Sequence, residues 1–351
     1  MTVFGLWMAW CVATVFVAAA LTRALVAWTT ARGIVDTPNA RSSHVRSTPR
    51  GGGLAIVGVV TAVVGAVAAL RPESLRPLAC VMLPALAVAV VSWCDDVWTL
   101  SNRLRFAVHV AAAVAVTAAL GPVRWVDLGS FGPLRFGSAA GPLTLLWIVG
   151  LTNAFNFMDG TDGIAGITAM AMAAGTAAVA AAFGAGTVAL PAAALAGSAL
   201  GFLTLNWQPA RIFMGDVGSA FCGFTLAALP LALPADCRPE ALAVAAVAAW
   251  PFIFDTAYTF LRRLGRGEAV FQAHRSHIYQ RLVIAGWSHR AVAWLYGGIA
   301  AFGATVAVAP LLDPMVRRVA DQAIIVALVA TMVLLPGLVT IAERKVPRVA
   351  R

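Results

Sequence analysis

Charged side chains are scarce in this sequence. They account for 11% of the 351 residues, whereas hydrophobic residues account for 61%, and the mean hydropathy is +0.86. Soluble globular domains carry roughly 25% charged residues. The composition therefore excludes a soluble domain and predicts that lipid surrounds most of the chain.

Cysteine is also sparse and shows no metal-ligand spacing or paired pattern. The five cysteines are scattered, mostly inside apolar runs: Cys11, Cys80, Cys94, Cys222 and Cys237. We expect neither a disulfide nor a zinc site. The first apolar run has no basic segment before it, which favours a permanent span over a cleaved signal peptide. No internal repeat is present, so we expect one polytopic domain over residues 1–351.

Apolar runs long enough to cross a bilayer recur along the whole chain. We predict an all-α integral membrane protein with about eleven transmembrane helices, and the 142–158 run is the weakest of them. The runs lie at 3–28, 53–70, 77–94, 105–120, 142–158, 163–183, 186–205, 218–234, 240–261, 289–311 and 320–342. Between two of them, residues 125–136 alternate around glycine turns, which predicts a small outer β-hairpin.

Basic residues set the predicted orientation. With Met1 outside, 17 Lys and Arg residues fall in inner loops and 7 in outer loops, and such an excess marks the cytoplasmic side. We therefore expect a multi-pass protein of the bacterial inner (plasma) membrane. This asymmetry explains the net charge of +10 without nucleic acid, and it leaves membrane lipids and phosphates as the natural partners.

Five aspartates fall on the predicted cytoplasmic side, in short connections that hold them close together: Asp95, Asp96, Asp159, Asp162 and Asp216. One loop aspartate alone needs no function, since carboxylates avoid the bilayer interior. Five with no adjacent lysine repel one another unless a cation binds. Mg²⁺ suits such a site because it takes one or two carboxylates plus phosphate oxygens, and Mn²⁺ is an alternative. Nearby amides able to hold a base edge or phosphate-bound water are Asn153, Asn156 and Asn206.

Two basic loops share this side. In 274–281, a helix would align His274, His277 and Arg281 on one face that could neutralise phosphates. A positive-inside anchor is the competing interpretation for the preceding Arg262 and Arg263. The other loop carries Arg41 and His44 and ends in three glycines, 51–53, which let a backbone approach a ligand closely. A flexible linker that binds headgroups would look similar.

Five segments in this order resemble one family, the polyprenyl-phosphate N-acetylhexosamine-1-phosphate transferases of glycosyltransferase family 4. The segments are PNAR at 38–41 with His44 and the glycines, DDVWTL at 95–100, NAFNFMDGTDG at 153–163, Asn206 with FMGDVGS at 213–219, and HRSHIYQRL at 274–282. Asp255 and Thr256 also resemble the residues that precede the family's histidine loop.

The resemblance implies a reaction and residue roles. UDP-N-acetylhexosamine and undecaprenyl phosphate would give polyprenyl-diphospho-sugar and UMP, with Mg²⁺ required. Asp216 would be the metal ligand with Asp95, and Asp95 and Asp96 would lie near the lipid phosphate. His277, with His274 and Arg275, would complete the catalytic set. The residues expected to bind substrate are Arg41, His44, Asn153, Asn156, Asp159, Asp162, Asn206 and Phe213, the last stacked on the uracil.

Two departures from the family pattern bear on the sugar. Many members carry a histidine string where this chain has Tyr279 and Gln280, and the muramoyl-pentapeptide enzyme has a lysine where this chain has Thr99. Both argue against peptidoglycan synthesis. The loop instead resembles initiators of O-antigen synthesis, and the Tyr279 ring would suit the methyl group of a 6-deoxy sugar.

Two alternatives stay open at this stage. One is a peptidoglycan enzyme of the phospho-N-acetylmuramoyl-pentapeptide transferase type. The other is a secondary transporter, which would place charge near the bilayer midplane. Away from the ends of the predicted spans, the only charged residues are Asp255 and Arg23, which disfavours a transporter. Homo-oligomer formation is possible and is not decided by the sequence.

Overall fold

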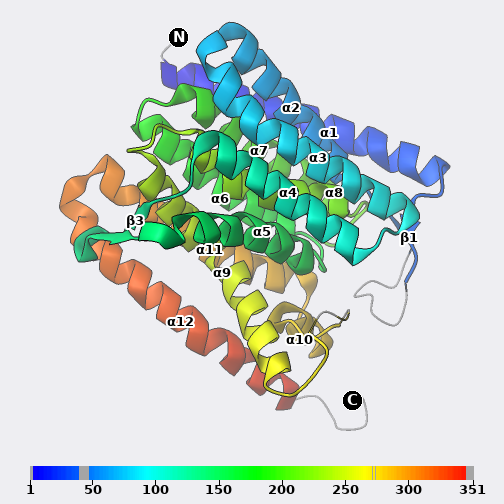
Figure 1. Cartoon of the computed structure of the whole chain (residues 1–351). Helices are drawn as coiled ribbons and strands as arrows, with labels where there is room; N and C mark the ends of the chain where they lie inside the picture. Colours follow the sequence, from blue (N-terminus) through cyan, green and yellow to red (C-terminus); the bar gives the residue numbers. More distant parts are fainter. Residues whose placement is uncertain (1–2, 39–46, 271, 273, 345–351) are drawn as a thin grey trace.

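The computed structural model describes residues 3–38, 47–270, 272 and 274–344, and it is an all-α bundle, as predicted (Figure 1). The α-helices are α1 (Val3–Ala31), α2 (Gly53–Leu70), α3 (Leu75–Trp98), α4 (Asn102–Leu120), α5 (Ala140–Met158), α6 (Ile164–Ala182), α7 (Gly186–Asn206), α8 (Asp216–Ala228), α9 (Arg238–Leu264), α10 (Ile278–Ile284), α11 (His289–Leu312) and α12 (Arg317–Arg344). Short 3₁₀ helices are η1 (Pro72–Ser74), η2 (Gly129–Phe131), η3 (Gly137–Ala139), η4 (Leu229–Ala232) and η5 (Pro314–Val316).

Two short antiparallel strand pairs lie at opposite ends of the bundle (Figure 1). β1 (Val35–Asp36) pairs with β2 (Thr48–Pro49), and β3 (Trp125–Asp127) pairs with β4 (Pro133–Arg135). The second pair confirms the predicted hairpin. It is fastened to α12, because Asp127 pairs with Arg317 at 3.1 Å and the Ser130 amide donates to Asp321 at 2.7 Å. We call this end the hairpin face, and the end with β1 and α10 the site face.

The helices form a buried centre and a lipid-facing periphery. In α6 and α7, 72% and 78% of the spanning residues are buried, against 17% in α1 and in α12. Buried alanine, glycine and phenylalanine residues dominate α6 to α8. Small residues let helix backbones approach closely, which is the main source of packing energy in a bilayer, where lipid removes the usual hydrophobic gain.

Two glycine contacts set how closely the central helices pack. A Cβ on Gly53 of α2 would lie 2.2 Å from the Gly218 Cα of α8. On α7, a Cβ on Gly201 would lie 2.4 Å from the Val15 carbonyl oxygen of α1, and Gly197 one turn earlier meets Thr14 at 2.1 Å. The first contact fixes the start of α8, and the second joins α1 to the centre.

The prediction of about eleven membrane helices is confirmed, with one of them shorter than expected. Within the described residues, ten helices are long and apolar enough to cross a membrane. The predicted 218–234 span is instead α8 followed by η4, and Pro230 and Pro234 prevent a longer α-helix. The 142–158 run, expected to be weakest, is the full helix α5.

The short α8 segment still joins the two faces. Thirteen α-helical and four 3₁₀ residues rise about 28 Å, close to the hydrocarbon thickness of a bilayer. Just after it, Arg238 donates to the Leu120 carbonyl at the hairpin-face end of α4, at 2.7 Å. Because α8 is buried, it needs no lipid-facing surface of full length. The ends of α1 and α12 nearest the termini accordingly lie on opposite faces (Figure 1).

We predict that Gly53→Ala destabilises the bundle by about 1–3 kcal/mol, because the new methyl group meets backbone atoms of α8 that cannot rotate away. Gly58→Ala in the same helix is the matched control, since no atom lies within 4 Å of its Cβ position. Thermal unfolding in detergent measures both variants. Equal unfolding midpoints would contradict the packing described.

Candidate active site

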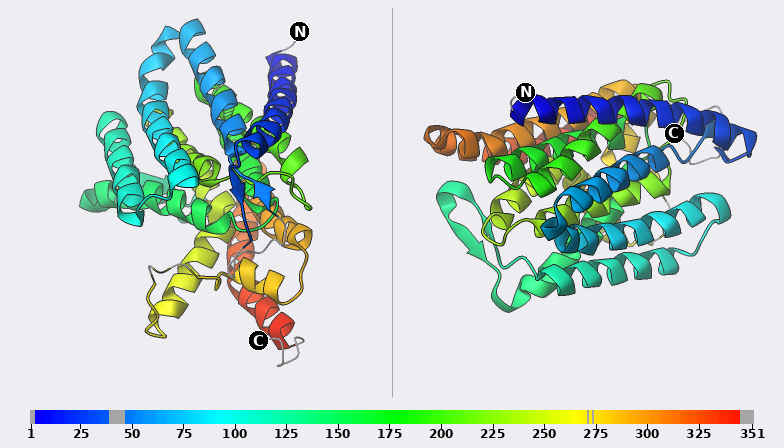
Figure 2. Two further views of the ribbon diagram at one scale, coloured as in Figure 1. Left: turned by 90° about the vertical axis from the view of Figure 1, so that its right-hand side faces the viewer. Right: turned by 90° about the horizontal axis from the view of Figure 1, so that it is seen from above.

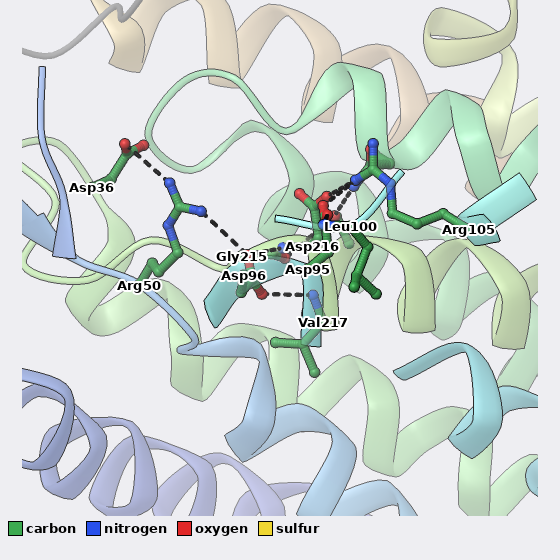
Figure 3. A network of polar contacts seen from close by, with 11 residues as sticks. Asp36, Arg50, Asp95, Asp96, Leu100, Arg105, Gly215, Asp216 and Val217 are labelled. Atoms are coloured by element: carbon green, nitrogen blue, oxygen red, sulfur yellow. Dashed lines mark hydrogen bonds and ion pairs between the residues drawn. The ribbon is translucent and has the colours of Figure 1, made fainter. Parts of the chain in front are cut away.

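Asp95 and Asp96 end α3 on the site face, and the structure gives them different partners (Figure 3). Asp96 accepts hydrogen bonds from the Asp216 and Val217 amides, both at 3.0 Å. These amides form the first turn of α8, whose helix dipole favours a carboxylate there. Asp96 therefore caps α8 and fixes the position of Asp216.

Asp95 faces the other way, toward α4. One Asp95 oxygen and one Asp216 oxygen both accept from the same Arg105 nitrogen, Nη1. Arg105 also donates to the Asn102 side chain at 2.8 Å. The two carboxylates thus converge on a single cationic atom (Figure 3), although they are 121 residues apart in the sequence.

A sharp turn after α3 positions Asp95. Thr99 adopts φ of 53°, a left-handed conformation that is rare for a β-branched residue. The turn brings the Leu100 amide onto the second Asp95 oxygen at 2.5 Å. Strained backbone of this kind is found at functional sites, where surrounding contacts enforce it.

The β1–β2 pair adds a second basic side chain. Arg50 pairs with Asp36 at 3.0 Å and lies 3.7 Å from Asp96. The following glycines hydrogen bond to the loop before α8: Gly52 N to Phe213 O and Gly53 N to Met214 O, both at 2.9 Å. The expectation that these glycines admit a ligand is wrong for Gly52 and Gly53, since protein atoms fill the space beside them.

The α5–α6 loop brings two more carboxylates. Burial, and then the neighbouring Asp216, Asp96 and Asp162, raise the pKa of Asp159 well above its usual value. Asp162 lies beside His289, with 3.2 Å between the Asp162 oxygen and the imidazole nitrogen, and it accepts from the Ala210 amide at 3.1 Å. Asp159 therefore faces the crowded carboxylates, whereas Asp162 joins α11 to the loop before α8.

The predicted amides have mainly structural partners. Asn206 is buried; it accepts from the Gly163 amide and donates to the Ile212 carbonyl, both at 2.9 Å. Asn153 donates to the Val149 carbonyl of its own helix at 2.7 Å. Asn156 donates to Ser219 at 3.1 Å and lies beside Asp216. Of the three, Asn156 is nearest to the convergent carboxylates.

The histidine loop is held by Asp255 of α9, whose side chain is fully buried. Asp255 accepts from the Ile278 and Tyr279 amides at 2.8 and 3.0 Å and from the Tyr296 hydroxyl at 2.7 Å. Its Oδ1 also lies 3.2 Å from His277 Nδ1. That contact leaves Nε2 of His277 as the ring nitrogen available to another group.

The expected helical face of His274, His277 and Arg281 does not form. α10 begins at Ile278, so His274 precedes it and His277 is its N-cap residue. Arg281 forms a double hydrogen bond with Glu343 of α12 at 2.8 and 2.9 Å. Burial, and then the neighbouring His277, lower the pKa of His274 to about 4, so the His274 ring is neutral at pH 7.

Tyr279 contradicts the expectation for the sugar. Its side chain is fully buried, and its hydroxyl donates to the Phe157 carbonyl at 3.0 Å. A Cβ on Gly160 would lie 2.1 Å from this hydroxyl oxygen. Tyr279 thus supports the loop that carries Asp159 and offers no surface to a 6-deoxy sugar. The His277 ring, 6.3 Å from the Phe157 ring, reaches the same loop.

The convergent carboxylates fit a hard divalent cation. Among the residues described, no group of three or more Asp, Glu, His or Cys side chains surrounds one point. Mg²⁺ needs only one or two carboxylates when phosphate oxygens and water complete its shell. Asp95 and Asp216 supply two oxygens, and the Arg105 nitrogen between them marks where positive charge is favoured.

The structure thus brings together most of the predicted site. Asp95 and Asp216 converge on Arg105, and Asp96 caps the helix that Asp216 begins. Asp159 lies close enough to Asp96 and Asp216 for their charges to raise its pKa, and the buried Asp162 and Asn206 brace the adjoining loops. Phe213, half-buried, lies in the loop before α8, and Arg275 lies beside His277. Arg41 and His44 fall outside the described residues.

Sequence reasoning missed Arg105 and Asp255 as site residues. Arg105 was counted only as a loop cation, and Asp255 only as a family-like residue inside a span. Charge inside or at the end of an apolar run was the available signal for both, because an unpaired ion there is disfavoured.

The comparisons with known proteins agree with this geometry. The profile of glycosyl transferase family 4 matches residues 78–233, from α3 to η4. The chain is 34% identical to the Probable undecaprenyl-phosphate N-acetylglucosaminyl 1-phosphate transferase of Bacillus subtilis, over 78% of this chain and 77% of that protein. It is 33% identical to the Decaprenyl-phosphate N-acetylglucosaminephosphotransferase of Mycolicibacterium smegmatis, over 86% and 82%.

A third relative is the Phospho-N-acetylmuramoyl-pentapeptide-transferase of a Synechococcus species, 31% identical over 74% of this chain and 78% of that protein. The matches cover most of this chain and most of each relative. The matched region includes both convergent carboxylates and Arg105. The chain is therefore a membrane-embedded enzyme of glycosyl transferase family 4.

Proposed function

We propose that this enzyme transfers N-acetylglucosamine 1-phosphate from UDP-N-acetylglucosamine to undecaprenyl phosphate or a similar polyprenyl phosphate, releasing UMP. The observation that carries the proposal is the convergence of Asp95 and Asp216 on one cationic atom at the site face. Reacting phosphates repel each other, so an enzyme that joins them needs fixed positive charge and a cation site more than a strong base.

Different residues would position the site and bind the phosphates. Asp96 holds α8, and Asp255 holds His277, so both are positioning residues. Arg105 neutralises Asp95 and Asp216 in this structure, and we infer that it turns to a phosphate oxygen when the donor binds. Arg50 lies on the other side of Asp96 and supplies a second guanidinium. The acceptor phosphate is already largely ionised at neutral pH, so it can attack directly.

The cation would be Mg²⁺, or Mn²⁺ in its place, held by Asp216 with Asp95. When bound, it supplies positive charge to the donor diphosphate. The half-buried Phe213 precedes Asp216 by three residues, and we infer that its ring stacks on the uracil. Asn156 and Asp159, whose side chains lie near Asp216, would bind the same donor. His277 presents Nε2 from the neighbouring loop.

N-acetylglucosamine is the proposed sugar because the two more similar relatives described above are named for it. The buried Tyr279 removes the physical reason for a 6-deoxy sugar. The product would be the first lipid-linked sugar of an envelope polysaccharide such as O-antigen. A peptidoglycan enzyme is the alternative with a specific observation behind it, the 31% identity to a muramoyl-pentapeptide transferase. Thr99 in place of that enzyme's lysine, and Tyr279 and Gln280 in place of a histidine string, argue against it.

The proposed side of the membrane follows from charge. The site face carries most of the arginines that the positive-inside rule would place in the cytoplasm. UDP-sugars are made in the cytoplasm, so a site there would meet its donor. We therefore propose that the site face is the cytoplasmic face of the bacterial inner membrane.

The donor assay tests the proposal directly. Purified enzyme with undecaprenyl phosphate and Mg²⁺ should release UMP from UDP-N-acetylglucosamine and give no product from UDP-muramoyl-pentapeptide. A 6-deoxy donor should be used no better, since the buried Tyr279 offers no apolar surface to its methyl group. Radiolabelled donors offered side by side give the ratio. Turnover of the pentapeptide would refute the assignment, and a clear 6-deoxy preference would refute the sugar.

Removing one convergent carboxylate should remove both catalysis and metal binding. We expect Asp216→Asn to lower kcat by about 10²–10³ at saturating Mg²⁺, as loss of one preorganised charged group does. Mg²⁺ should also raise the free energy of unfolding of wild type, by about 2.7 kcal/mol at 100 times its Kd, and should not raise that of Asp216→Asn. Asp127→Asn on the hairpin face is the control. Wild-type turnover in Asp216→Asn would show that the site is elsewhere.

Cysteine labelling tests the orientation. In a variant whose five native cysteines are replaced by alanine, Ala269→Cys in the exposed loop after α9 should react with an impermeant maleimide only in inside-out vesicles. Leu134→Cys on β4, 49% exposed, should react in intact cells. The reverse pattern would place the site face outside.

A further inference from the structure

A cleft between α1 and the end of α7 lies apart from the convergent carboxylates. It has a volume of about 490 Å³, and its lining is mostly apolar except for two arginines: Arg23, Val26, Ala27, Thr30, Ala31, Leu205 and Arg211. α1 faces outward along much of its length, with Phe16 70% exposed and Trp28 39% exposed. The cleft therefore belongs to the lipid-facing periphery.

The packing of the two helices explains why the cleft opens where it does. α1 and α7 are in tight contact at Gly201, opposite Val15 to Ala19. α7 ends at Asn206, whereas α1 continues to Ala31. At about 1.5 Å per residue, α1 runs on for roughly 10 Å beyond α7. The right view of Figure 2 shows α1 extending past the green helices.

Neither arginine in this cleft has a counterion among the residues that the structure describes. Within the part of the chain that the structure describes, neither Arg23 nor Arg211 is among the ion pairs, and both residues are exposed. Arg23 lies within a helix that faces lipid, where an arginine needs an anion or the membrane surface. If the end of α7 lies at that surface, both guanidinium groups lie near the depth of lipid phosphates.

We propose that this cleft binds an anionic phospholipid of the surrounding membrane, with its phosphodiester between Arg23 and Arg211 and an acyl chain along the exposed face of α1. Guanidinium groups match phosphate oxygens in charge and geometry. The apolar lining from Val26, Ala27 and Leu205 suits the glycerol and upper acyl carbons.

The acceptor lipid is a different occupant, and the packing separates it from this cleft. Gly52 lies against Phe202 of α7 and the Phe213 carbonyl, and Gly215 lies against Asp96 and the Gly51 amide. This packed glycine segment stands between α7 and the convergent carboxylates. None of the residues that line the cleft belongs to the set Asp95, Arg105 and Asp216, so the phospholipid site is separate from theirs.

A lipid bound at Arg211 would also affect the loop before α8. Arg211 lies in the connection that carries Phe213 and leads to Asp216, and its amide donates to the Leu205 carbonyl at 2.8 Å. A phospholipid that bridges Arg211 to Arg23 would fasten this connection to α1. The lipid is thus a structural ligand of the loop before α8.

Native mass spectrometry of the full chain in detergent tests the proposal, with phosphatidylglycerol, phosphatidylcholine and undecaprenyl phosphate as separate probes. Wild type should bind one phosphatidylglycerol in preference to phosphatidylcholine. Each arginine near an anionic headgroup strengthens binding about fivefold. The double variant Arg23→Gln with Arg211→Gln should therefore lose phosphatidylglycerol affinity by about tenfold or more, with an unchanged unfolding midpoint.

The matched control is Arg103→Gln with Arg266→Gln, which removes two exposed arginines from the same face and should keep wild-type binding. Equal losses in the two double variants, or no lipid preference in wild type, would overturn the proposal. So would competition by undecaprenyl phosphate for the phosphatidylglycerol site. None of these outcomes depends on transferase activity, so failure here leaves the proposed function untouched.

Discussion

The capping of α8 by Asp96 is the interaction on which the site depends. Two amides of the first turn of α8 donate to one carboxylate that ends α3. Asp216 begins α8, so its position follows from this cap. The close contact of Gly53 with Gly218 and the hydrogen bonds from Gly52 and Gly53 to the preceding loop hold the same turn from the other side. A short buried helix can thus present a carboxylate at a fixed point.

A similar arrangement holds the second half of the site. Asp255 accepts the first amides of α10 and contacts the His277 ring, so a buried carboxylate again caps a short helix and aims a functional side chain. Tyr279 and Phe157 then connect this loop to the one that carries Asp159. Movement of either half would therefore be transmitted to the other through packed aromatic rings and one hydrogen bond.

The sequence predicted the membrane helices, the hairpin and the gathering of Asp95, Asp96, Asp159 and Asp216, because apolar run length and carboxylate placement are governed by the bilayer itself. The sequence could not assign different roles to the neighbours Asp95 and Asp96. Their roles differ because Asp95 contacts Arg105 of α4, whereas Asp96 caps α8. Nor could the sequence show that Tyr279 is buried, because that depends on Gly160 in the α5–α6 loop and Tyr296 in α11. The run at 218–234 was expected to be a full span because a fully buried segment keeps the apolar composition of one, although its α-helix is short.

Arg105 gives the free enzyme an internal counterion, and this has a consequence for cation binding. The carboxylates of Asp95 and Asp216 would repel each other strongly if both were unpaired at the membrane boundary. Arg105 relieves the repulsion but occupies the point where a divalent cation would bind. Cation binding must therefore displace the guanidinium, which lowers apparent cation affinity in the absence of substrate. A donor diphosphate offers the displaced guanidinium a new anionic partner, so cation and donor should each bind more tightly in the presence of the other.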